Sequence, residues 1–257
     1  MNRRRILWAS IVFGALLTSY HMIRTYQNSN RYMDIKSWSG MNLDREMLTA
    51  RRDSFDMYAP DGNWKGYMTQ NFYFKEGAYL MEDVSRFSDG SVVEYAAFKI
   101  DTSAMKTDTL HINMRTDQGN AIVNLKIDHQ YVTGSYHVTK GEQERMIKID
   151  TTYEKTILRN EIYMLINAVE WNIGDQLSLN VLSPLSMAVS KATIRAISVE
   201  DLTCQGQNTS CMKLELRSDG KIAENDIWIT RASPRRILKF KVLEPALNII
   251  LTKTSPN

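Results

Sequence analysis

The stretch Leu110–Asp128, LHINMRTDQGNAIVNLKID, holds the pattern that decides the fold. On both sides of the polar segment Asp117–Asn120, apolar side chains recur at every second position. A period of two is that of a β-strand with one buried face, and a short polar turn between two such runs predicts an antiparallel hairpin. The alternating apolar positions are Leu110, Ile112 and Met114 before the turn, and Ala121, Val123, Leu125 and Ile127 after it.

The same alternation continues in both directions, from about Trp64 to about Leu251. Turn sequences such as Ser88–Gly90 and Ser218–Gly220 separate the runs. This spacing predicts a mainly β protein with a large curved antiparallel sheet, or a half-barrel, of about ten to twelve strands and one wet face.

One helix is predicted to interrupt the strands, within Arg159–Trp171. Its apolar residues follow the i, i+3, i+4, i+7 spacing of an amphipathic helix, at Ile162, Leu165, Ile166 and Val169. A second short helix is expected to begin at Ser183–Pro184, where Ser can cap and Pro suits the first turn. A third candidate is Asp44–Asp53.

The N-terminal end has the composition of a targeting segment. Arg3–Arg5 precede an uncharged, mostly apolar run from Ile6 to Ile23, which is about the shortest length that crosses a bilayer core. More arginines before the run than directly after it favour an N-in orientation. The side chains expected in the bilayer are Ile6, Leu7, Trp8, Ile11, Val12, Phe13, Leu16 and Leu17.

The sequence allows three interpretations of this segment. No A-x-A-like cleavage site stands out around Gly14–Ser19, which favours an uncleaved signal anchor. A cleaved signal peptide is the alternative, and a buried core helix of a cytosolic protein is a third. We expect residues 1–23 to form the signal anchor, residues 24–60 a polar stalk with a short helix, and residues 61–257 a β-rich periplasmic domain.

The charge of the chain is concentrated at that end. The whole chain has 32 Lys and Arg against 29 Asp and Glu, a net charge of +3. Without Arg3–Arg5, the remaining 29 basic residues balance the 29 acidic ones. A neutral body argues against a nucleic-acid-binding surface, which needs clustered basic residues to neutralise phosphates.

The two cysteines, Cys204 and Cys211, flank the polar segment Gln205–Ser210 between two strand-like runs. A hairpin with that loop would bring the thiols side by side, so we expect a disulfide in an exported protein. The spacing is not C-x-x-C, and no His or further Cys lies near in the sequence, so neither a redox pair nor a zinc site is predicted.

Catalytic motifs are missing from the sequence: it has no G-x-S-x-G, no P-loop and no G-x-G-x-x-G. His111, His129 and His137 lack the spacing of a metal site, and Glu142 and Glu144 fall in a predicted hairpin loop. We therefore expect no catalytic residue, no metal and no cofactor. Clustering of these histidines with carboxylates in a cleft would instead indicate an enzyme acting on envelope polymers.

The body is rich in Met and aromatic residues. A curved antiparallel sheet closed by a helix can leave an apolar cavity, and such side chains suit an adaptable lipid-like ligand. Ordinary core packing is the alternative for each of them. The candidates for the cavity wall are Trp64, Met68, Phe72, Phe74, Phe98, Ile162, Ile166 and Trp171.

The C-terminal half has a distinctive order of segments: Leu165–Asn167, Trp171–Leu179, Ile194–Glu200, the Cys204/Cys211 hairpin, Asn225–Ile229 and Arg235–Phe240. This order resembles an uncharacterised family of periplasmic β-rich domains of Gram-negative bacteria, whose fold is similar to the half-barrel of the periplasmic lipoprotein carriers. The resemblance spans residues 64–252 and implies an envelope location and binding of an acyl or apolar ligand. It brings no catalytic residues, and the predicted anchor departs from the soluble carriers.

Together these features predict a non-enzymatic, single-pass protein of the bacterial inner membrane with its C-terminal domain in the periplasm, or a soluble periplasmic protein after cleavage. The expected ligand is a lipid, an acyl chain or a lipoprotein. The second hypothesis is a structural or accessory subunit that docks onto a cell-envelope complex through a sheet edge or the anchor.

Overall fold

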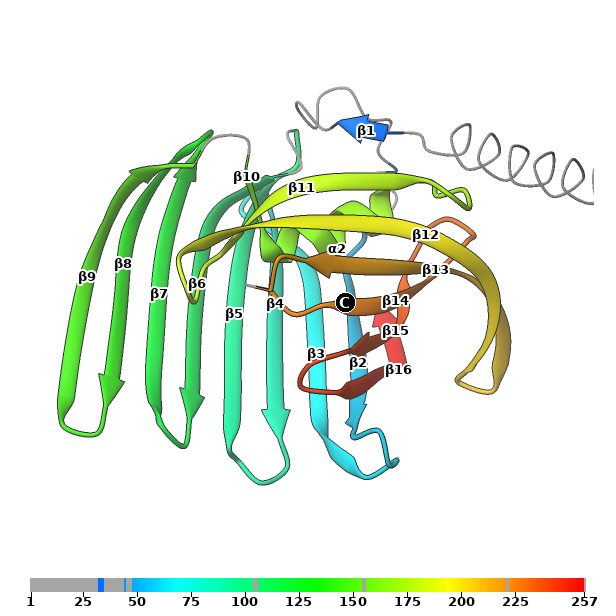
Figure 1. Ribbon diagram of the computed structural model, residues 1–257, viewed down its shortest axis with the longest axis horizontal. Helices are drawn as coiled ribbons and strands as arrows, with labels where there is room; N and C mark the ends of the chain where they lie inside the picture. The colour runs from blue at the N-terminus through cyan, green and yellow to red at the C-terminus, as the bar shows by residue number, and fades with distance from the viewer. Residues whose placement is uncertain are drawn as a thin grey trace, which may run out of the picture.

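The strands of this protein form one large open sheet (Figure 1). A computed structural model describes residues 32–34, 44, 48–103, 106–153, 156–220 and 222–256. Sixteen strands belong to the sheet, so the expectation of a mainly β fold with a large antiparallel sheet is confirmed, while the expected ten to twelve strands are too few. The described residues contain one helix.

The first half of the sheet, which we call the flat half, consists of eight strands that pair in chain order as antiparallel neighbours. They are β2 (Arg51–Tyr58), β3 (Trp64–Lys75), β4 (Ala78–Phe87), β5 (Val92–Asp101), β6 (Lys106–Thr116), β7 (Gly119–Asp128), β8 (Tyr131–Lys140) and β9 (Gln143–Thr152). The alternation in Leu110–Asp128 produces the β6–β7 hairpin, in which Thr116 pairs with Gly119.

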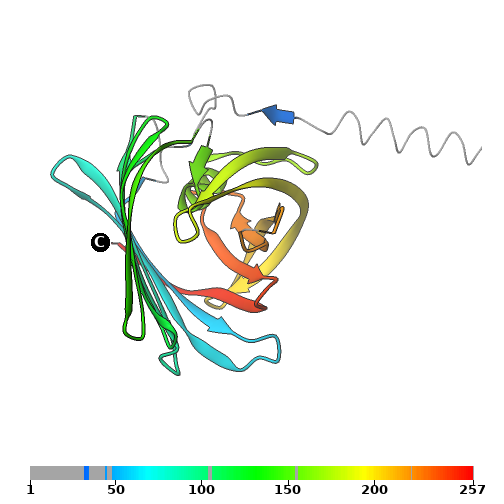
Figure 2. The same ribbon diagram turned by 60° about the vertical axis from the view of Figure 1, so that its left-hand side comes forward.

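The second half, which we call the rolled half, is also antiparallel and curls beside the first (Figure 2). It contains β11 (Gln176–Ser183), β12 (Ala188–Cys204), β13 (Gln207–Ser218), β14 (Asn225–Thr230), β15 (Ile237–Val242) and β16 (Leu247–Pro256). Two three-residue strands, β1 (Tyr32–Asp34) and β10 (Thr156–Leu158), add in parallel to β11. β16 pairs with β2 and so joins the two halves into one sheet.

The helix α2 (Arg159–Ala168) lies between the halves and is buried on nearly all sides. Ile162, Leu165 and Ile166 pack in the core of the rolled half, while Met164 and Ala168 pack in the core of the flat half. The helix is held at its start by Glu161, whose carboxylate accepts hydrogen bonds from the backbone N–H groups of Leu158 at 2.9 Å and Thr107 at 2.6 Å. Each half of the sheet therefore forms an apolar core that includes residues of the same helix.

The helix predicted within Arg159–Trp171 is confirmed as α2, which ends at Ala168. The other two expected helices are wrong in the described residues. Ser183 closes strand β11, and the residues after it form a turn, so the helix expected at Ser183–Pro184 is not present. Strand β2 takes up the end of the Asp44–Asp53 candidate and lies inside the sheet, although its residues were expected in the stalk.

The underestimate of the strand number has a physical reason in β9. Glu144, expected in a loop, belongs to this strand. β9 is an edge strand whose side chains are mostly exposed on both faces, and its apolar and polar residues alternate only over Ile147–Asp150. Such a strand gives a weaker sequence signal than one that buries a whole face.

The expected disulfide is also wrong: Cys204 and Cys211 are free thiols. The β12–β13 hairpin turns at Gln205 and Gly206, both with positive φ, instead of through the whole polar segment. Cys204 therefore pairs with Gln207, and Cys211 pairs with Glu200. Four positions along a strand amount to roughly 13 Å, beyond the Cα separation of about 4.4–6.8 Å that a disulfide spans.

The expected transmembrane segment, Ile6–Ile23, lies outside the described residues and stays a prediction. In the part of the chain that the structure describes, no helix is both long enough and apolar enough to cross a bilayer.

Candidate functional site

An interior pocket of about 210 Å³ lies between the flat half, α2 and the inner face of the rolled half. Its apolar wall comes from both halves of the sheet and includes Met68, Met81, Ala96, Phe98, Ile112, Phe240, Val242 and Ile249. Its polar wall comes mostly from the flat half and α2, with Ser183 and Asn225 from the rolled half, and includes Gln70, Asp83, Ser85, Glu94, Arg159, Asn160 and Tyr163. The pocket thus has apolar and charged walls that face the same space.

The strand register gathers the polar side chains of the flat half on its inner face. Gln70 on β3 pairs with Asp83 on β4, and Ser85 on β4 pairs with Glu94 on β5. Residues two apart on a strand share a face, so these four side chains project to the same side of the sheet. The amide Nε2 of Gln70 donates to the Asp83 carboxylate at 3.2 Å.

Burial changes the protonation of both carboxyl groups. It raises the pKa of Asp83 to about 7, and the nearby Glu94 carboxylate adds to the rise, while the Gln70 hydrogen bond and the Arg159 charge oppose it. Burial also raises the pKa of Glu94, again against the charge of Arg159. Carboxyl groups with raised pKa inside a cavity are typical of functional sites, although structural ion networks also produce them.

In the described pocket wall the one cationic side chain is that of Arg159, the first residue of α2. Tyr163, one turn further along the helix, together with Glu94 and Asp83, raises the pKa of Arg159 against the opposing effect of burial. The guanidinium therefore lies in the field of two carboxyl groups, and the wall carries two acidic groups against one basic group.

Asn160 is the most buried polar residue contributed by α2 to the wall, with 8% of its surface exposed. Its Nδ2 donates to Oγ1 of Thr107 at 3.2 Å. Its Oδ1 is buried and has no hydrogen-bond partner within the described chain. A buried acceptor without a donor carries a free-energy cost of about 1–3 kcal/mol, so a donor at this position would be stabilising.

Two of the eight predicted cavity residues, Met68 and Phe98, line the pocket. The others lie in the hydrophobic cores or at the surface. Phe72 packs in the core of the flat half, whereas Ile162, Ile166 and Trp171 pack in the core of the rolled half. Trp64 and Phe74 are exposed, with 49% and 57% of their surfaces accessible.

The exposure of Trp64 has a local cause. The pairing of β2 with β3 shifts between Met57 and Tyr58, so that Trp64 pairs with Tyr58. This irregularity turns the Trp64 side chain to the outer face of the sheet. There its indole Nε1 donates to the outward-facing Asp56 at 3.2 Å. Phe74 lies near the end of β3, and its ring packs against Tyr79, with the ring centroids 5.0 Å apart.

The charged residues of the pocket were missed from the sequence, although a signal was present. Glu94 falls between Val92 and Ala96 on a face that was predicted to be apolar, and Gln70 falls between Met68 and Phe72. A polar residue that interrupts the buried face of a strand must find a partner or a ligand inside. These polar residues within an apolar strand face were the sequence signal for the pocket.

A larger depression of about 490 Å³ lies on the outer face of the flat half and includes Tyr73, Glu82, Lys99 and His111. It is shallow and open to solvent, and its charged groups already have partners in the surface. The Glu82 carboxylate accepts from the hydroxyl of Tyr73 at 2.9 Å, and Lys99 pairs with Asp108 at 3.2 Å. The smaller interior pocket is the better-defined site because protein encloses it on several sides.

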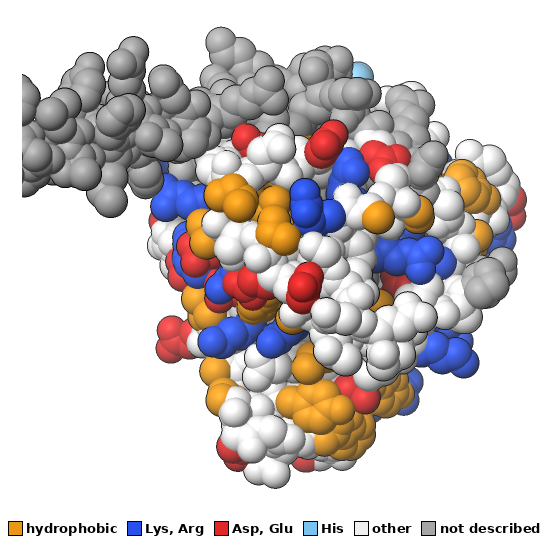
Figure 3. Space-filling model, turned by 90° about the vertical axis from the view of Figure 1, so that its right-hand side faces the viewer, with side chains coloured by type: hydrophobic (Ala, Val, Ile, Leu, Met, Phe, Trp, Pro, Cys, Tyr) orange, Lys and Arg blue, Asp and Glu red, His pale blue; other side chains and the backbone are white. Residues whose placement is uncertain are grey.

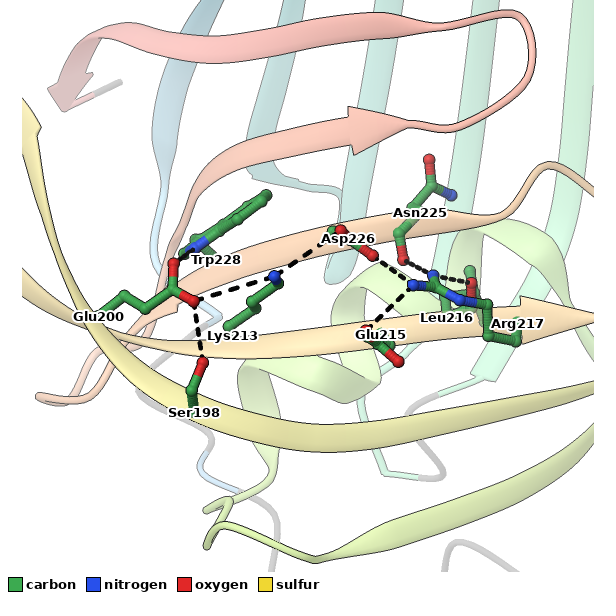
Figure 4. Close-up of polar contacts among 9 residues, drawn as sticks. All are labelled: Ser198, Glu200, Lys213, Glu215, Leu216, Arg217, Asn225, Asp226 and Trp228. Atoms are coloured by element: carbon green, nitrogen blue, oxygen red, sulfur yellow. Dashed lines mark hydrogen bonds and ion pairs between the residues drawn. The ribbon is translucent and has the colours of Figure 1, made fainter.

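The outer face of the rolled half carries a network of polar contacts around Trp228 (Figure 4). The indole Nε1 of Trp228 donates to Glu200 at 2.7 Å, and this hydrogen bond lowers the pKa of Glu200. Lys213 lies 3.9 Å from both Glu200 and Asp226, and Arg217 pairs with Asp226 at 2.6 Å. Charges of both signs are interspersed on this side of the molecule (Figure 3), so we assign the network to stability of the sheet surface.

The three histidines of the β-rich body do not meet. His111 lies 2.7 Å from Oδ1 of Asn124, His137 lies 2.6 Å from Glu144, and His129 is in the β7–β8 turn. Within the described residue ranges, no group of three His, Cys, Asp or Glu side chains could hold a metal ion.

Comparison with known proteins gives a fold and no family. No family model matches the chain. No curated protein matches it either. Among solved structures it is similar to a β-barrel-like protein of domain of unknown function DUF1849 from Brucella abortus, with a TM-score of 0.55 and 11% identity over 82% of this chain and 98% of that one.

A Bacteroides fragilis protein with a YmcC-like fold gives a TM-score of 0.29 at 7% identity, over 80% of this chain and 96% of that one. The Brucella similarity supports the expected resemblance to an uncharacterised β-rich domain, at the level of the fold. The likeness to lipoprotein carriers stays a prediction.

Proposed function

We propose that this chain is a non-enzymatic binding protein of the bacterial envelope that holds the apolar part of a lipid, an acyl chain or a lipoprotein in its interior pocket. The observation that carries the proposal is the pocket itself, whose apolar wall is drawn from both halves of the sheet. Met68 and Met81 in that wall have flexible side chains that adapt to apolar ligands of irregular shape.

The size of the pocket limits what it can enclose. A volume of about 210 Å³ is below the ~300–1,000 Å³ of pockets that bury whole drug-sized ligands. We therefore expect the pocket to hold one segment of a ligand, with the rest of the molecule outside it. The arginine cluster and apolar run at residues 3–23 support a location at the inner membrane, where such ligands are present.

Photolabelling tests this function on the full chain. An alkyl alcohol that carries a diazirine should label residues of the pocket wall, as mapped by peptide mass spectrometry. Ala96→Phe should reduce this labelling at least tenfold, because residue 96 faces the pocket from β5. Ala97→Phe is the matched control, since residue 97 lies on the other face of the same strand.

The outcomes separate the two faces. Loss of labelling in Ala96→Phe alone supports the proposal, provided that both variants keep the parent's circular dichroism spectrum and melting temperature. Labelling that Ala97→Phe abolishes would move the ligand to the outer depression. Labelling that neither variant changes would contradict an interior site.

Docking onto an envelope complex is the second candidate function, and strand β9 is the observation that favours it. Within the described chain β9 pairs only with β8, and its ten residues leave one backbone edge available for another strand. Met146 on β9 is 73% exposed. A photocrosslinker at position 146 should capture a partner of defined mass, and one at the exposed Ile173 should not. Capture at neither position would contradict docking through this edge.

A further inference from the structure

Strand β9 forms one edge of the sheet, and no described segment covers it (Figure 1). At the other end of the sheet, the short strands β1 and β10 cover the outer side of β11. β9 has ten residues, contains no proline and keeps an unbroken register with β8. Edges that are protected from pairing are usually short, bulged or interrupted by proline. This edge has none of these features, so it can accept another strand, and it lies apart from the pocket and its ligand.

The charges on the outer face of β9 alternate in sign. Ile149 packs in the core of the flat half, so the even-numbered positions of the strand project to the outer face. In chain order these are Glu144, Met146, Lys148 and Asp150, and Met146 is 73% exposed. A strand with charges of one sign would repel its own copy. A strand with both signs can match its copy in particular registers.

One register of two antiparallel copies matches well. A twofold axis relates the copies, and residues that lie opposite each other share a face of the sheet. With the axis at Met146, Glu144 of each copy lies opposite Lys148 of the other. Two opposite-charge pairs then flank a contact between the two Met146 side chains. Asp150 falls opposite the turn residue Glu142, outside the paired strands, where water and salt screen the like charges.

The next registers along the strand match less well. If the axis moves one residue further on, Glu144 lies opposite Asp150 twice, and like charges directly opposite are destabilising. Two residues further on, Lys148 lies opposite itself. Three residues further on, Lys148 lies opposite Asp150, but the exposed Met146 then faces the hydroxyl of Thr152. The register about Met146 is the one that joins opposite charges and covers this methionine with an apolar side chain.

We propose that β9 binds a second copy of this chain as an antiparallel strand, with residues 143–149 of each copy paired about Met146. The pairing joins the two flat halves into one continuous sheet. It leaves the contact of Glu144 with His137 in place, because that contact of 2.6 Å is directed to β8. The Glu144 side chain is 68% exposed, so it can also reach Lys148 of the second copy.

Cysteine cross-linking of the full chain in mild detergent tests the pairing. Directly opposite Cα atoms of antiparallel strands lie about 4.5–5.5 Å apart, a separation that a disulfide spans. On mild oxidation, Met146→Cys should therefore give a disulfide-linked product of twice the mass of the chain. Ile173→Cys should give none. It is the matched control because residue 173 is 59% exposed but lies outside β9, and both variants retain Cys204 and Cys211.

Charge exchange tests the register. Glu144→Lys should raise the dissociation constant of the dimer about tenfold in sedimentation experiments, because it converts both opposite-charge pairs into like-charge pairs. The double variant with Glu144→Lys and Lys148→Glu restores opposite signs and should bring the constant back to within about threefold of the parent's. Lys126→Glu should leave it unchanged, because residue 126 lies on β7, two strands from the edge.

The outcomes are compared in variants that keep the parent's circular dichroism spectrum and melting temperature. A parent chain that stays monomeric would overturn the proposal, as would a dimer that Glu144→Lys does not weaken. A dimer that the double variant does not restore would overturn the register about Met146. A cross-linked product that contains another protein would assign the edge to the docking function instead. The pocket is tested separately by photolabelling, so either proposal can fail without the other.

Discussion

The two halves of the sheet bury faces of different chemistry. The inner face of the rolled half is mostly apolar, and residues such as Leu177, Leu214 and Ile227 are completely buried in its core. The inner face of the flat half has an apolar core too, but Asp83 and Glu94 interrupt it beside the pocket. Both halves therefore bury an apolar core, and the flat half also carries charged groups that a ligand can use.

The largest expected effect is a core truncation in the rolled half. Leu214→Ala should lower the free energy of unfolding by about 2–5 kcal/mol, because it leaves a cavity in a fully buried site. Met68→Ala in the flat half should cost about 2 kcal/mol, the lower end of the same range, because Met68 already borders a pocket. Urea denaturation of both variants measures the difference. Equal costs would show that the two inner faces are packed alike.

A charge prediction concerns the flat half alone. The folded-state pKa of Asp83 is raised to about 7 from 3.8, so the folded protein keeps a proton that the unfolded chain releases at lower pH. Stability should therefore fall as pH rises from about 4 to 7, by roughly 2 kcal/mol when solvent around the half-buried group is allowed for. Asp83→Asn should flatten this dependence in urea titrations at pH 5 and 8.

The control for this pH dependence is Glu82→Gln, which lies on the outer face and should retain the parent's slope. A slope in Asp83→Asn as steep as that of the parent would assign the effect to other groups, Glu94 first among them.

The contact between α2 and the flat half gives an intermediate effect. Glu161→Gln should lower the free energy of unfolding by about 1–3 kcal/mol, because one amide oxygen cannot serve the N–H groups of both Thr107 and Leu158. Glu170→Gln, at an exposed acidic position just after α2, should change it by less than about 0.5 kcal/mol. Unchanged stability in Glu161→Gln would mean that both N–H groups find other acceptors.

The smallest expected effect tests the rolled half. Reductant should shift the melting temperature by less than about 1 °C, since no disulfide joins Cys204 and Cys211. A bond closing this hairpin would contribute about 2–3 kcal/mol, and its loss would lower the melting temperature by several degrees. Burial raises the pKa of Cys211 to about 11, so alkylation by iodoacetamide at pH 7.5 should also be slow.

The sequence predicted the hairpins because strands such as β6 and β7 bury one face, and alternation reports that condition directly. It predicted α2 for the same reason, from the spacing of Ile162, Leu165 and Ile166. It could not predict that the opposite side of this helix is buried as well. That depends on a sheet that wraps both sides, which is a tertiary arrangement.

The pocket was harder to predict because its residues are brought together by the pairing register of the strands. Asp83, Glu94 and Arg159 come from three elements, and only the pairing of β4 with β5 and the position of α2 bring them together. Met68 and Phe98 were found because they follow the apolar pattern. Trp64 was misplaced because one shift in strand register, which composition does not reveal, reversed its face.

The pairing of β16 with β2 has a consequence for how the chain reaches its fold. The Oγ1 of Thr254 donates to Asp53 across a separation of 201 residues, whereas β3 to β9 form only neighbouring hairpins. During synthesis those hairpins can form as soon as they are made, but β2 keeps an open edge until β16 has followed it. High contact order slows folding, so we expect this late closure to limit the rate and to leave the nascent sheet dependent on protection from aggregation.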